Sequence, residues 1–387
     1  MDRSWQTKLI HTDARVPEGY RSLATPVYRG STTLFPNAAA ATDDWRQHEV
    51  GYTYGLFGTP TSLELAARLA ELEGGRHTFL TPGGQGAIAL IYLALTKAGD
   101  HVLVPDSAYG PNRGLATGVL ARFGVEAEFY PPTIGAEIAG LIRDTTTLVW
   151  CESPGSVTME VQDVPAIATA AHARGALVAL DNTYAAGVYF DAFAHGVDVT
   201  MQALTKYVGG HSDVLLGSVT ARDTALVERL GDTLQFLGMG VSPDECSLAL
   251  RGLQTLAVRL AALERSTLAV ARWLAERPEV ERVLHPALPS CPGHELWCRD
   301  FTGSTSIFSV VFQPRYTEAQ LLAFADALEL FEIGYSWGGV TSLVVPQFGI
   351  PRSTPTQRRE SLVRFNVGLE RVEDLLADLA QALERLG

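Results

Sequence analysis

Residues 197–213 read VDVTMQALTKYVGGHSD, and this stretch decides the fold. The apolar run 197–204 has the length of a buried strand, and it is followed by Thr205, Lys206 and the pair Gly209-Gly210. A lysine at such a place is either a solvated loop cation or a functional group. Ligands of open α/β sheets bind at the carboxyl ends of the strands. The stretch therefore predicts a strand of such a sheet, with Lys206 at its ligand-binding edge.

The sequence around this stretch alternates short apolar runs with helical segments between residue 59 and about residue 220. That alternation is typical of a mostly parallel sheet with helices on both faces. A helix is predicted from Pro60, with Thr59 as its N-cap and Gly74-Gly75 as its end. The other predicted strands are 100–105, 145–152 and 175–181, and the other predicted helices are 86–99 and 164–175.

The chain divides into three parts by composition. Residues 1–58 are rich in Pro and Gly and predict an extended N-terminal arm that contacts a neighbouring subunit. Residues 59–250 form the predicted α/β domain. Residues 251–387 combine long amphipathic helices with short strands and predict a smaller C-terminal α+β domain. The strands predicted there are 306–312 and 362–368, and the helices are 247–276 and 372–386.

Charge and cysteine content narrow the classes of partner. A formal charge of -13 and a pI near 5.2 argue against nucleic acid or an anionic membrane and favour a small-molecule ligand. No run of about 18 apolar residues and no N-terminal apolar block are present, so we expect a cytoplasmic protein.

The segment CPGHELWC, 291–298, could form a metal clip, but structural zinc usually takes four ligands. We therefore expect a loop with a buried thiol and no metal.

Four polar signals fall at the predicted strand ends. Asp181 ends one apolar run, Lys206 follows another, Tyr109 follows a third, and the segment PGGQG, 82–86, opens a helix. Glycines at a helix start suit a phosphate, although a plain tight turn explains them equally well. A pyridoxal phosphate enzyme needs a lysine for the Schiff base, a carboxylate for the pyridine nitrogen, an aromatic ring to stack and donors for the phosphate. All of these occur here.

Longer motifs add a resemblance. Six segments resemble the Cys/Met-metabolism family of pyridoxal phosphate enzymes, and within it the bacterial cystathionine β-lyases. They are TKYVGGHSD (205–213), ESPGSVTMEVQDVPAI (152–167), DNTYAAG (181–187), HPALPSCPGHELWCRDFTGS (285–304), YSWGG (335–339) and RFNVGLERVEDL (364–375). The resemblance runs nearly end to end, and it implies the fold-type I transferase-like α/β architecture.

The resemblance also implies roles around the cofactor. Lys206 forms the Schiff base and transfers protons, Asp181 pairs with the pyridine nitrogen, and Tyr109 stacks on the ring. Three residues near the strand ends are implied to bind the phosphate: Gly84, Gln85 and Thr205. Tyr54, in GYTYG, matches a tyrosine that reaches this phosphate from the neighbouring subunit.

Substrate recognition is implied for the C-terminal part. Arg364 matches the arginine that binds the substrate carboxylate, a task that suits a guanidinium, although a surface ion pair is the alternative. Tyr335, Ser336 and Trp337 match a signature shared by β-lyases, and packing in the core is the alternative for Trp337. Two positions depart from the family: Leu56 stands where an arginine normally binds phosphate, and Thr341 where many relatives have glutamate.

The resemblance implies α,β-elimination of a sulfur amino acid, with cystathionine giving homocysteine, pyruvate and ammonia, and so predicts a carbon–sulfur lyase. The family also implies a homotetramer built from dimers that share active sites. Alternatives are a broader cysteine-S-conjugate lyase or cysteine desulfhydrase, and a γ-acting relative such as methionine γ-lyase, cystathionine γ-synthase or γ-lyase. A non-catalytic regulatory protein that binds pyridoxal phosphate is more distant. A nicotinamide dehydrogenase would need a GxGxxG after a strand, which is absent.

Overall fold

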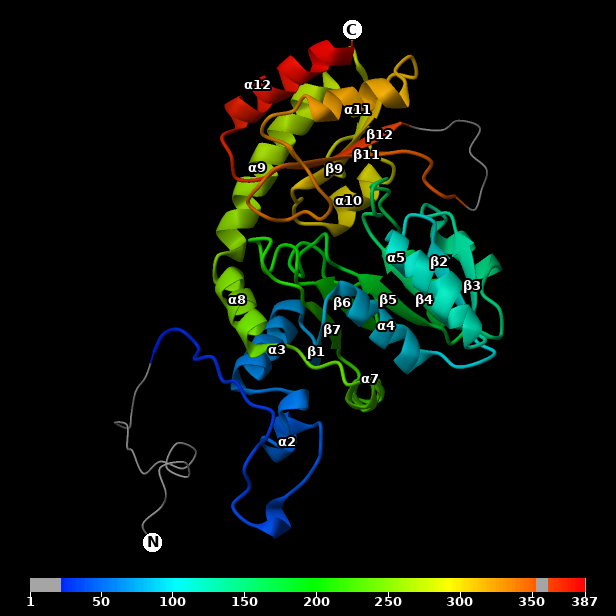
Figure 1. Cartoon of the computed structure of the whole chain (residues 1–387). Helices are drawn as coiled ribbons and strands as arrows, with labels where there is room; N and C mark the ends of the chain where they lie inside the picture. The colour runs from blue at the N-terminus through cyan, green and yellow to red at the C-terminus, as the bar shows by residue number, and fades with distance from the viewer. Residues whose placement is uncertain (1–21, 353–360, 387) are drawn as a thin grey trace.

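Two β-sheets organise the computed structural model, which describes residues 22–352 and 361–386 (Figure 1). The larger sheet has seven strands in the order β1-β7-β6-β5-β4-β2-β3. The run β6-β5-β4-β2-β3 is parallel, whereas β7 and β1 are antiparallel to their neighbours. The strands are β1 (His77–Thr81), β2 (His101–Pro105), β3 (Glu126–Tyr130), β4 (Thr146–Glu152), β5 (Leu177–Asp181), β6 (Val199–Ala203) and β7 (Gly217–Ala221).

The prediction of a mostly parallel sheet is confirmed, and β2, β4, β5 and β6 lie where their apolar runs predicted them. Three strands of this sheet, β1, β3 and β7, have no counterpart among the predicted strands. The strand β3 reads EAEFY and carries two glutamates, and β7 reads GSVTA and has no long apolar run, so neither shows the pattern of a buried strand.

Helices cover both faces of this sheet because successive strand residues point to opposite sides. Val102 and Val104 lie in a core cluster with side chains of α4 and α7, whereas Leu103 lies in a separate cluster with side chains of α6. The helices of this part are α3 (Pro60–Glu73), α4 (Gly84–Leu95), α5 (Gly110–Gly114), α6 (Val164–His172), α7 (Thr224–Leu237) and α8 (Pro243–Gln254), with short helical turns η3 (Leu115–Leu120) and η4 (Gly135–Gly140).

The helix α3 has the ends that its sequence predicted. Thr59 is the N-cap and forms a capping box with Ser62, and Pro60 occupies the first turn, where its missing N–H has no partner to lose. Gly74 ends the helix in the left-handed conformation at φ 69°, which glycine adopts without steric cost. Local sequence signals therefore fix both ends of this element.

The smaller sheet has five strands in the order β10-β11-β12-β9-β8, antiparallel except for the pair β10–β11. The predictions at 306–312 and 362–368 correspond to β9 and β12. The strands are β8 (Val280–Leu284), β9 (Ile307–Phe312), β10 (Glu332–Ile333), β11 (Leu343–Gln347) and β12 (Leu362–Asn366), and the helices are α9 (Leu256–Ala275), α10 (His294–Asp300), α11 (Glu318–Asp326) and α12 (Val372–Leu383), followed by η5 (Glu384–Leu386).

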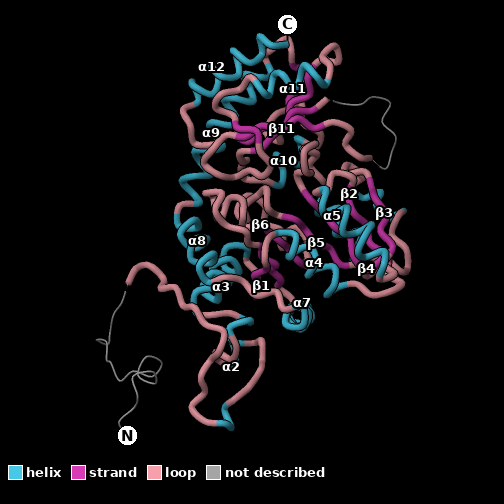
Figure 2. The backbone as a smooth tube through the Cα atoms, in the orientation of Figure 1, coloured by secondary structure: helices cyan, strands magenta, loops and turns pink. Residues whose placement is uncertain are grey.

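This smaller sheet packs against α9, α11 and α12 through one apolar cluster that contains Phe308, Val363 and Phe365. Figure 2 shows the two sheets at different levels of the molecule, with α9 beside the smaller sheet and α8 on the same side at the level of the larger sheet. The first turns of α9 contact the larger part through Leu256 and Leu260, which cluster with Tyr207. We propose that the boundaries between the arm, the α/β domain and the C-terminal domain lie after residues 58 and 250.

The single helix predicted over 247–276 is wrong, because the chain breaks at Thr255 into α8 and α9. The carbonyl of Gly252 accepts hydrogen bonds from Thr255 and from the Arg259 guanidinium, which ends the helical ladder there. Within the described ranges no single helix has both the length and the apolar composition to cross a membrane; α8 and α9 meet these criteria only together, with a bend of 63°.

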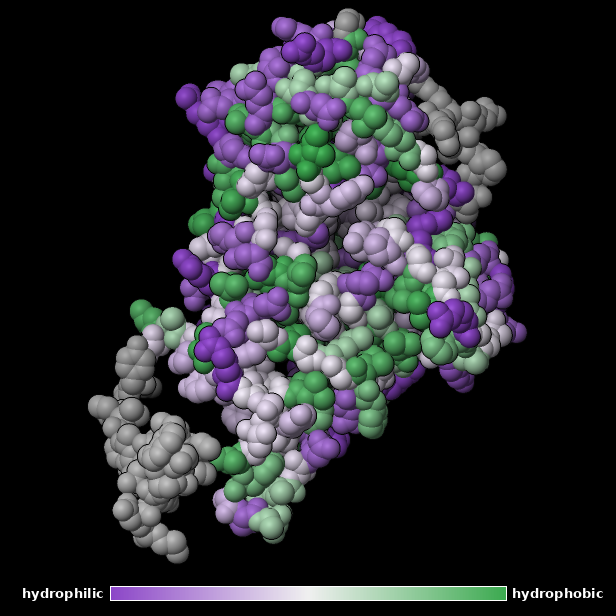
Figure 3. Space-filling view, in the orientation of Figure 1, coloured by the Kyte–Doolittle hydropathy of each residue, from purple (hydrophilic) through white to green (hydrophobic). Residues whose placement is uncertain are grey.

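The described part of the N-terminal arm, residues 22–58, is extended, as predicted. It contains only η1 (Ala38–Ala40), α2 (Gln47–Val50) and η2 (Gly55–Phe57) and projects from the rest of the chain in Figure 1. Figure 3 shows hydrophobic residues at the end of this projection, and Leu23 and Leu34 are almost fully exposed. Residues 1–21 of the predicted arm lie outside the described residues.

Candidate active site

A cavity of about 420 Å³ lies where the strands of the larger sheet end and the smaller sheet begins. The loops after β1, β2, β4, β5 and β6 supply one side of it, and the loop after β10 supplies the other. Most of the predicted site residues line this cavity: Gly84, Gln85, Tyr109, Asp181, Thr205, Lys206, Tyr335, Ser336 and Trp337. These residues therefore lie together at the strand ends, where a ligand of an open α/β sheet is expected.

Lys206 lies in the turn after β6 and is half-buried. Its Nζ donates a hydrogen bond to Ser336 Oγ at 2.5 Å and lies 5.2 Å from the centre of the Trp337 ring. Burial, together with the positive charge of Arg364, lowers the pKa of Lys206 to about 8, and Asp181 opposes this shift. An amine with this pKa is neutral in part near neutral pH and can act as a base.

Asp181 ends β5 and lines the same cavity as Lys206. Its Oδ1 accepts hydrogen bonds from Thr183 N at 3.0 Å and from Thr183 Oγ1, and Thr183 Oγ1 in turn accepts one from Ala203 N at 2.9 Å. Burial raises the pKa of Asp181, whereas the Thr183 donors and the Lys206 charge oppose the rise. These contacts fix the orientation of the carboxyl group, and a cation bound beside it would hold it ionised.

Glu152 is a buried cavity residue to which the sequence analysis gave no role. It ends β4 directly beside Asp181 in the sheet register, and its Oε2 accepts a hydrogen bond from Tyr109 N at 2.7 Å. Burial first, and the Asp181 charge second, raise the pKa of Glu152 well above its usual range. Because Asp181 has two Thr183 donors and a nearby cation, we assign the proton of this carboxyl pair to Glu152. Its place at a strand end was the one signal in the sequence.

A neutral Glu152 should tolerate amide replacement. We expect Glu152→Gln to keep the acceptor for Tyr109 N and to leave kcat/KM within about threefold, whereas Glu152→Leu leaves the partly buried Tyr109 N–H without this acceptor and lowers kcat/KM by about tenfold. Because the carboxyl pKa of Glu152 is raised in the folded protein, the free energy of unfolding of wild type falls as pH rises above the ordinary glutamate range. Glu152→Gln lacks this ionisation, so its melting temperature should rise relative to that of wild type as pH increases above about 5. A large loss of activity in Glu152→Gln at pH 7 would show that Glu152 is ionised.

The opposite end of the cavity is formed by backbone at the start of α4. The helix begins at Gly84 after Gly83, whose φ is 81°, and its first N–H groups have no partner within the helix. A Cβ on Gly84 would lie 2.7 Å from the Ala203 Cβ, so only glycine fits between α4 and the end of β6. Thr205 Oγ1 and N both bond Leu216 O at 3.2 Å, and Gln85 Nε2 donates to Pro111 O. This end can hold an anion.

The smaller sheet contributes the loop that holds Tyr335, Ser336 and Trp337. Ser336 has φ 82°, an uncommon conformation for a residue with a Cβ. Arg364, in β12, lies behind this loop and donates from Nη2 to Ser336 O at 3.4 Å; it is buried, with 9% of its surface exposed. Its charge contributes to the lowered pKa of Lys206, and Arg364 is not among the residues that line the cavity.

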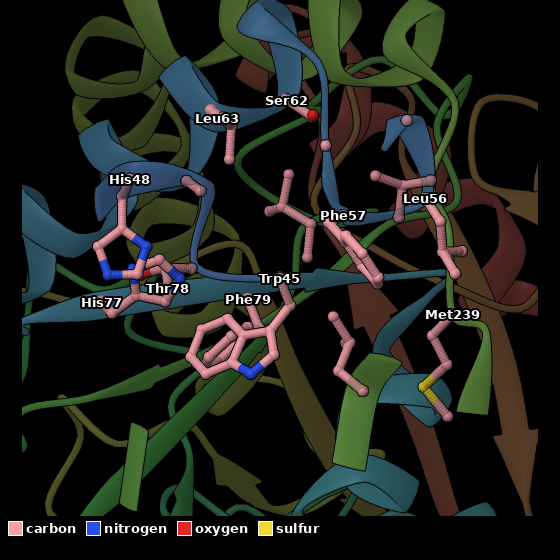
Figure 4. Close-up of a pocket in the computed structure, with 16 residues that line it drawn as sticks. Trp45, His48, Leu56, Phe57, Ser62, Leu63, His77, Thr78, Phe79 and Met239 are labelled. Atoms are coloured by element: carbon pink, nitrogen blue, oxygen red, sulfur yellow. The ribbon is translucent and has the colours of Figure 1, made fainter. Parts of the chain in front are cut away.

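Tyr54 is the predicted site residue that the structure does not bring to the cavity. It lies in the arm, where it forms a bridge with Thr32, and it is 43% exposed. Within one chain it cannot contact a ligand of the same cavity, so its role across a subunit interface stays a prediction. The neighbouring departure, Leu56, lines an apolar pocket together with Phe57 and Met239, with His48 and His77 at its other end (Figure 4). The structure therefore uses Leu56 for packing.

The segment 291–298 differs from the loop that was predicted. Residues His294–Asp300 form α10. Cys291 is buried and its Sγ contacts Met159 O at 3.1 Å, whereas Cys298 is exposed and its Sγ lies 3.5 Å from His294 Nε2. The two thiols therefore have separate partners, and the prediction of a buried thiol holds for Cys291 alone. Among the residues described, no group of three or more His, Cys, Asp or Glu side chains is placed to hold a metal ion.

The residues around the cavity fit pyridoxal phosphate. The donor set has a partly neutral amine at Lys206, a carboxyl group at Asp181, the phenol ring of Tyr109 and a glycine-started helix for an anion. These are the groups that hold the Schiff base, the pyridine nitrogen, the ring face and the phosphate of this cofactor.

Comparisons with known proteins agree with this fit. The model of the family described as Cys/Met metabolism PLP-dependent enzyme matches residues 6–384. The chain is 42% identical over 368 residues to cystathionine β-lyase of Bordetella avium, covering 93% of this chain and 91% of the relative. It is 39% identical to cystathionine β-lyase of Salmonella typhimurium, covering 100% and 99%.

A solved structure extends the comparison to the fold. Cystathionine γ-synthase from Xanthomonas oryzae pv. oryzae, solved in complex with cystathionine, is 31% identical and superimposes with a TM-score of 0.86 over 96% of this chain and 95% of that one. The predicted α/β architecture is thereby confirmed as that of the pyridoxal phosphate enzymes. With its cavity, its donor set and a match over nearly its full length, the chain belongs to the Cys/Met metabolism family of PLP-dependent enzymes.

Proposed function

We propose that the protein is a carbon–sulfur lyase that cleaves cystathionine by α,β-elimination to homocysteine, pyruvate and ammonia. The observation that carries the proposal is the pair Lys206 and Asp181 in one cavity, each held by its own hydrogen bonds. The names of the relatives support the β-lyase reaction over others. The proposal includes the phosphate-binding roles of Gly84, Gln85, Thr205 and Tyr54 and the carboxylate-binding role of Arg364.

Different residues around the cavity have different roles in the proposed reaction. Bound pyridoxal phosphate supplies an electron sink that makes the substrate Cα–H acidic. The Lys206 amine takes the proton from Cα, and the hydrogen bond to Ser336 Oγ fixes the direction of the amine. The Arg364 guanidinium binds the substrate carboxylate by releasing Ser336 O. Burial raises the pKa of the Tyr109 phenol, so Tyr109 keeps its proton and can give it to the departing sulfur.

The reaction is tested by its products. Purified protein loaded with pyridoxal phosphate is incubated with cystathionine, cysteine and methionine, and the oxo acids are separated. We expect pyruvate and homocysteine in equal amounts from cystathionine. Dominant 2-oxobutanoate would instead support γ-elimination, the second candidate, which the likeness to a cystathionine γ-synthase favours. Pyruvate from cysteine or from other S-conjugates at higher kcat/KM than from cystathionine would identify a broader cysteine-S-conjugate lyase.

The family resemblance also leads to a proposal for the assembly state and the cellular location of the protein. We propose a homotetramer of dimers in the cytoplasm, in which Tyr54 of one chain completes the cavity of its neighbour. The exposed Leu23 and Leu34 on the projecting arm and the distance of Tyr54 from its own cavity support a contact between chains. Sedimentation of the cofactor-loaded protein measures the assembly state, and a monomer with full activity would contradict this arrangement.

A further inference from the structure

The strand β12 carries a second polar residue on the face that holds Arg364. Side chains alternate along a strand, so Arg364 and Asn366 share one face while Val363 and Phe365 lie in the apolar cluster on the other. Asn366 is 1% exposed. The cofactor and substrate roles proposed above leave Asn366 without a task, although it lies two residues from Arg364.

The Asn366 amide makes three hydrogen bonds to groups near the cavity. Its Oδ1 accepts from Gly338 N at 2.9 Å and from Ser306 Oγ at 2.7 Å, and its Nδ2 donates to Thr341 O at 3.0 Å. A backbone N–H can only donate and a carbonyl oxygen can only accept, so these partners fix which way the amide points. Asn366 therefore bonds the loop of residues 335–341 at two places, on either side of Gly339.

This loop passes directly over the backbone of Lys206. Gly338 has φ 82°, and a Cβ there would lie 3.1 Å from the Lys206 carbonyl carbon and 3.2 Å from Tyr207 N. Ser336, in the same loop, is also held at a positive φ and accepts the hydrogen bond from Lys206 Nζ. A conformation of this kind persists only when its surroundings hold it. The hydrogen bonds of Asn366 with Gly338 N and Thr341 O provide such a constraint.

A chain of hydrogen bonds joins Asn366 to the other side of the site. Ser306 has one hydroxyl proton, which goes to Asn366 Oδ1, so Tyr207 OH must be the donor in its 2.9 Å bond with Ser306 Oγ. Burial raises the pKa of Tyr207 to about 12, which keeps this proton in place. Tyr207 follows Lys206 directly, so Asn366 is connected to both partners of the contact between Lys206 and Ser336.

We propose that Asn366 is a positioning residue for the reaction: its amide holds the 335–341 loop over Lys206 and so keeps Ser336 Oγ on Lys206 Nζ. The amine then faces the substrate in one direction during proton transfer. This inference rests on the proposed role of Lys206 as the base. Two residues on the same face of β12 then have different roles: Arg364 binds the substrate carboxylate, and Asn366 orients the loop of residues 335–341.

The test compares two replacements of Asn366. Asn366→Leu branches at the same carbon, is larger and forms no hydrogen bonds, and Asn366→Asp keeps both acceptor contacts but sets a carboxylate oxygen against Thr341 O. We expect Asn366→Leu to speed amide hydrogen exchange at Gly338 in the cofactor-free protein by about tenfold and to lower kcat by about tenfold, with KM within about threefold. The pH midpoint of the visible absorption band of the cofactor-loaded protein should also shift. Asn366→Asp should fall between Asn366→Leu and wild type.

The matched control is Ser342→Ala in the segment that follows the same loop. Ser342 is buried, and its hydroxyl bonds Glu370 and Gly368 N, so it stabilises the turn without touching Gly338 or Lys206. We expect a lower melting temperature with kcat, Gly338 exchange and the absorption band unchanged. Equal effects of Ser342→Ala and Asn366→Leu on kcat, or unchanged Gly338 exchange in both Asn366 variants, would overturn the proposal.

Two of these measurements do not depend on the proposed substrate. Hydrogen exchange and the absorption band need no turnover, and kcat is measured on whichever sulfur amino acid the protein cleaves. Failure to cleave cystathionine would therefore refute the proposed function while the Asn366 result still stands or falls by itself. Should Asn366→Leu fail to fold, Asn366→Asp carries the comparison with Ser342→Ala.

Discussion

Replacing Lys206 by alanine is expected to abolish elimination, with kcat lower by at least about 10³-fold. The variant loses both the covalent link to the cofactor and the amine that moves the Cα proton. In wild type, the Lys206 side chain contacts Ser336 and Trp337, and no other described lysine lines the cavity. Overall folding should change little, because burial of the Lys206 amine is unfavourable to its charged form and alanine removes that penalty.

Borohydride reduction and peptide mapping give a direct measurement. The sequence has three lysines, Lys8, Lys97 and Lys206, so a pyridoxyl adduct can be assigned without ambiguity. The adduct should be found on Lys206 in wild type and should be absent from Lys206→Ala. Lys97→Ala, at an exposed position outside the cavity, serves as the control and should retain full activity. An adduct on another lysine would overturn the assignment.

Replacing Asp181 by asparagine is expected to lower kcat by about 10²- to 10³-fold. The amide keeps an oxygen for Thr183, so the local shape is retained, but the negative charge that stabilises a protonated pyridine nitrogen is lost. Removing one partner of a buried charge pair costs about 3–5 kcal/mol, and the lower half of that range corresponds to a rate loss of about 10²- to 10³-fold. Steady-state rates of the cofactor-loaded variant give the measurement.

The control for Asp181 is its hydrogen-bond partner. Thr183→Ser keeps a hydroxyl that can bond both Asp181 and Ala203 N, so its rate should stay within about threefold of wild type. Thr183→Val removes the hydroxyl, frees the carboxyl group to rotate and should give an intermediate rate. Rates of Asp181→Asn within tenfold of wild type would mean that Asp181 does not act on the pyridine nitrogen.

Much of the site could be predicted because each residue sits where a strand ends. Asp181, Lys206 and Tyr109 follow apolar runs that are easy to recognise, and parallel strands carry their ends to one edge of the sheet. Glu152 ends an equally clear run but was left without a role, because a single carboxyl group in a sequence does not show its neighbours. Its raised pKa arises from burial and from Asp181, which lies on another strand.

Other features could not be predicted because their causes are distant in the chain. The break between α8 and α9 arises where the Gly252 carbonyl turns to Thr255 and Arg259 instead of continuing the helix. The weak strands β3 and β7 form because neighbouring strands offer them hydrogen-bond partners, not because their own sequences favour a strand. Burial and pairing in three dimensions overrode the local pattern at these positions.

The sequence by itself determined the strands β2, β4, β5 and β6 with the helices α4 and α6, the ends of α3, and the residue types that a pyridoxal phosphate site requires. These depend on side-chain periodicity, capping and motif, which act over a few neighbouring residues. Only the tertiary structure decided that Lys206 touches Ser336, 130 residues away, that Glu152 lies beside Asp181 in the sheet, and that Asn366 bonds the loop of residues 335–341. Contacts of this kind depend on how the two sheets pack, because hydrogen bonds and pKa shifts require atoms within a few ångströms of one another, whatever their separation in the chain.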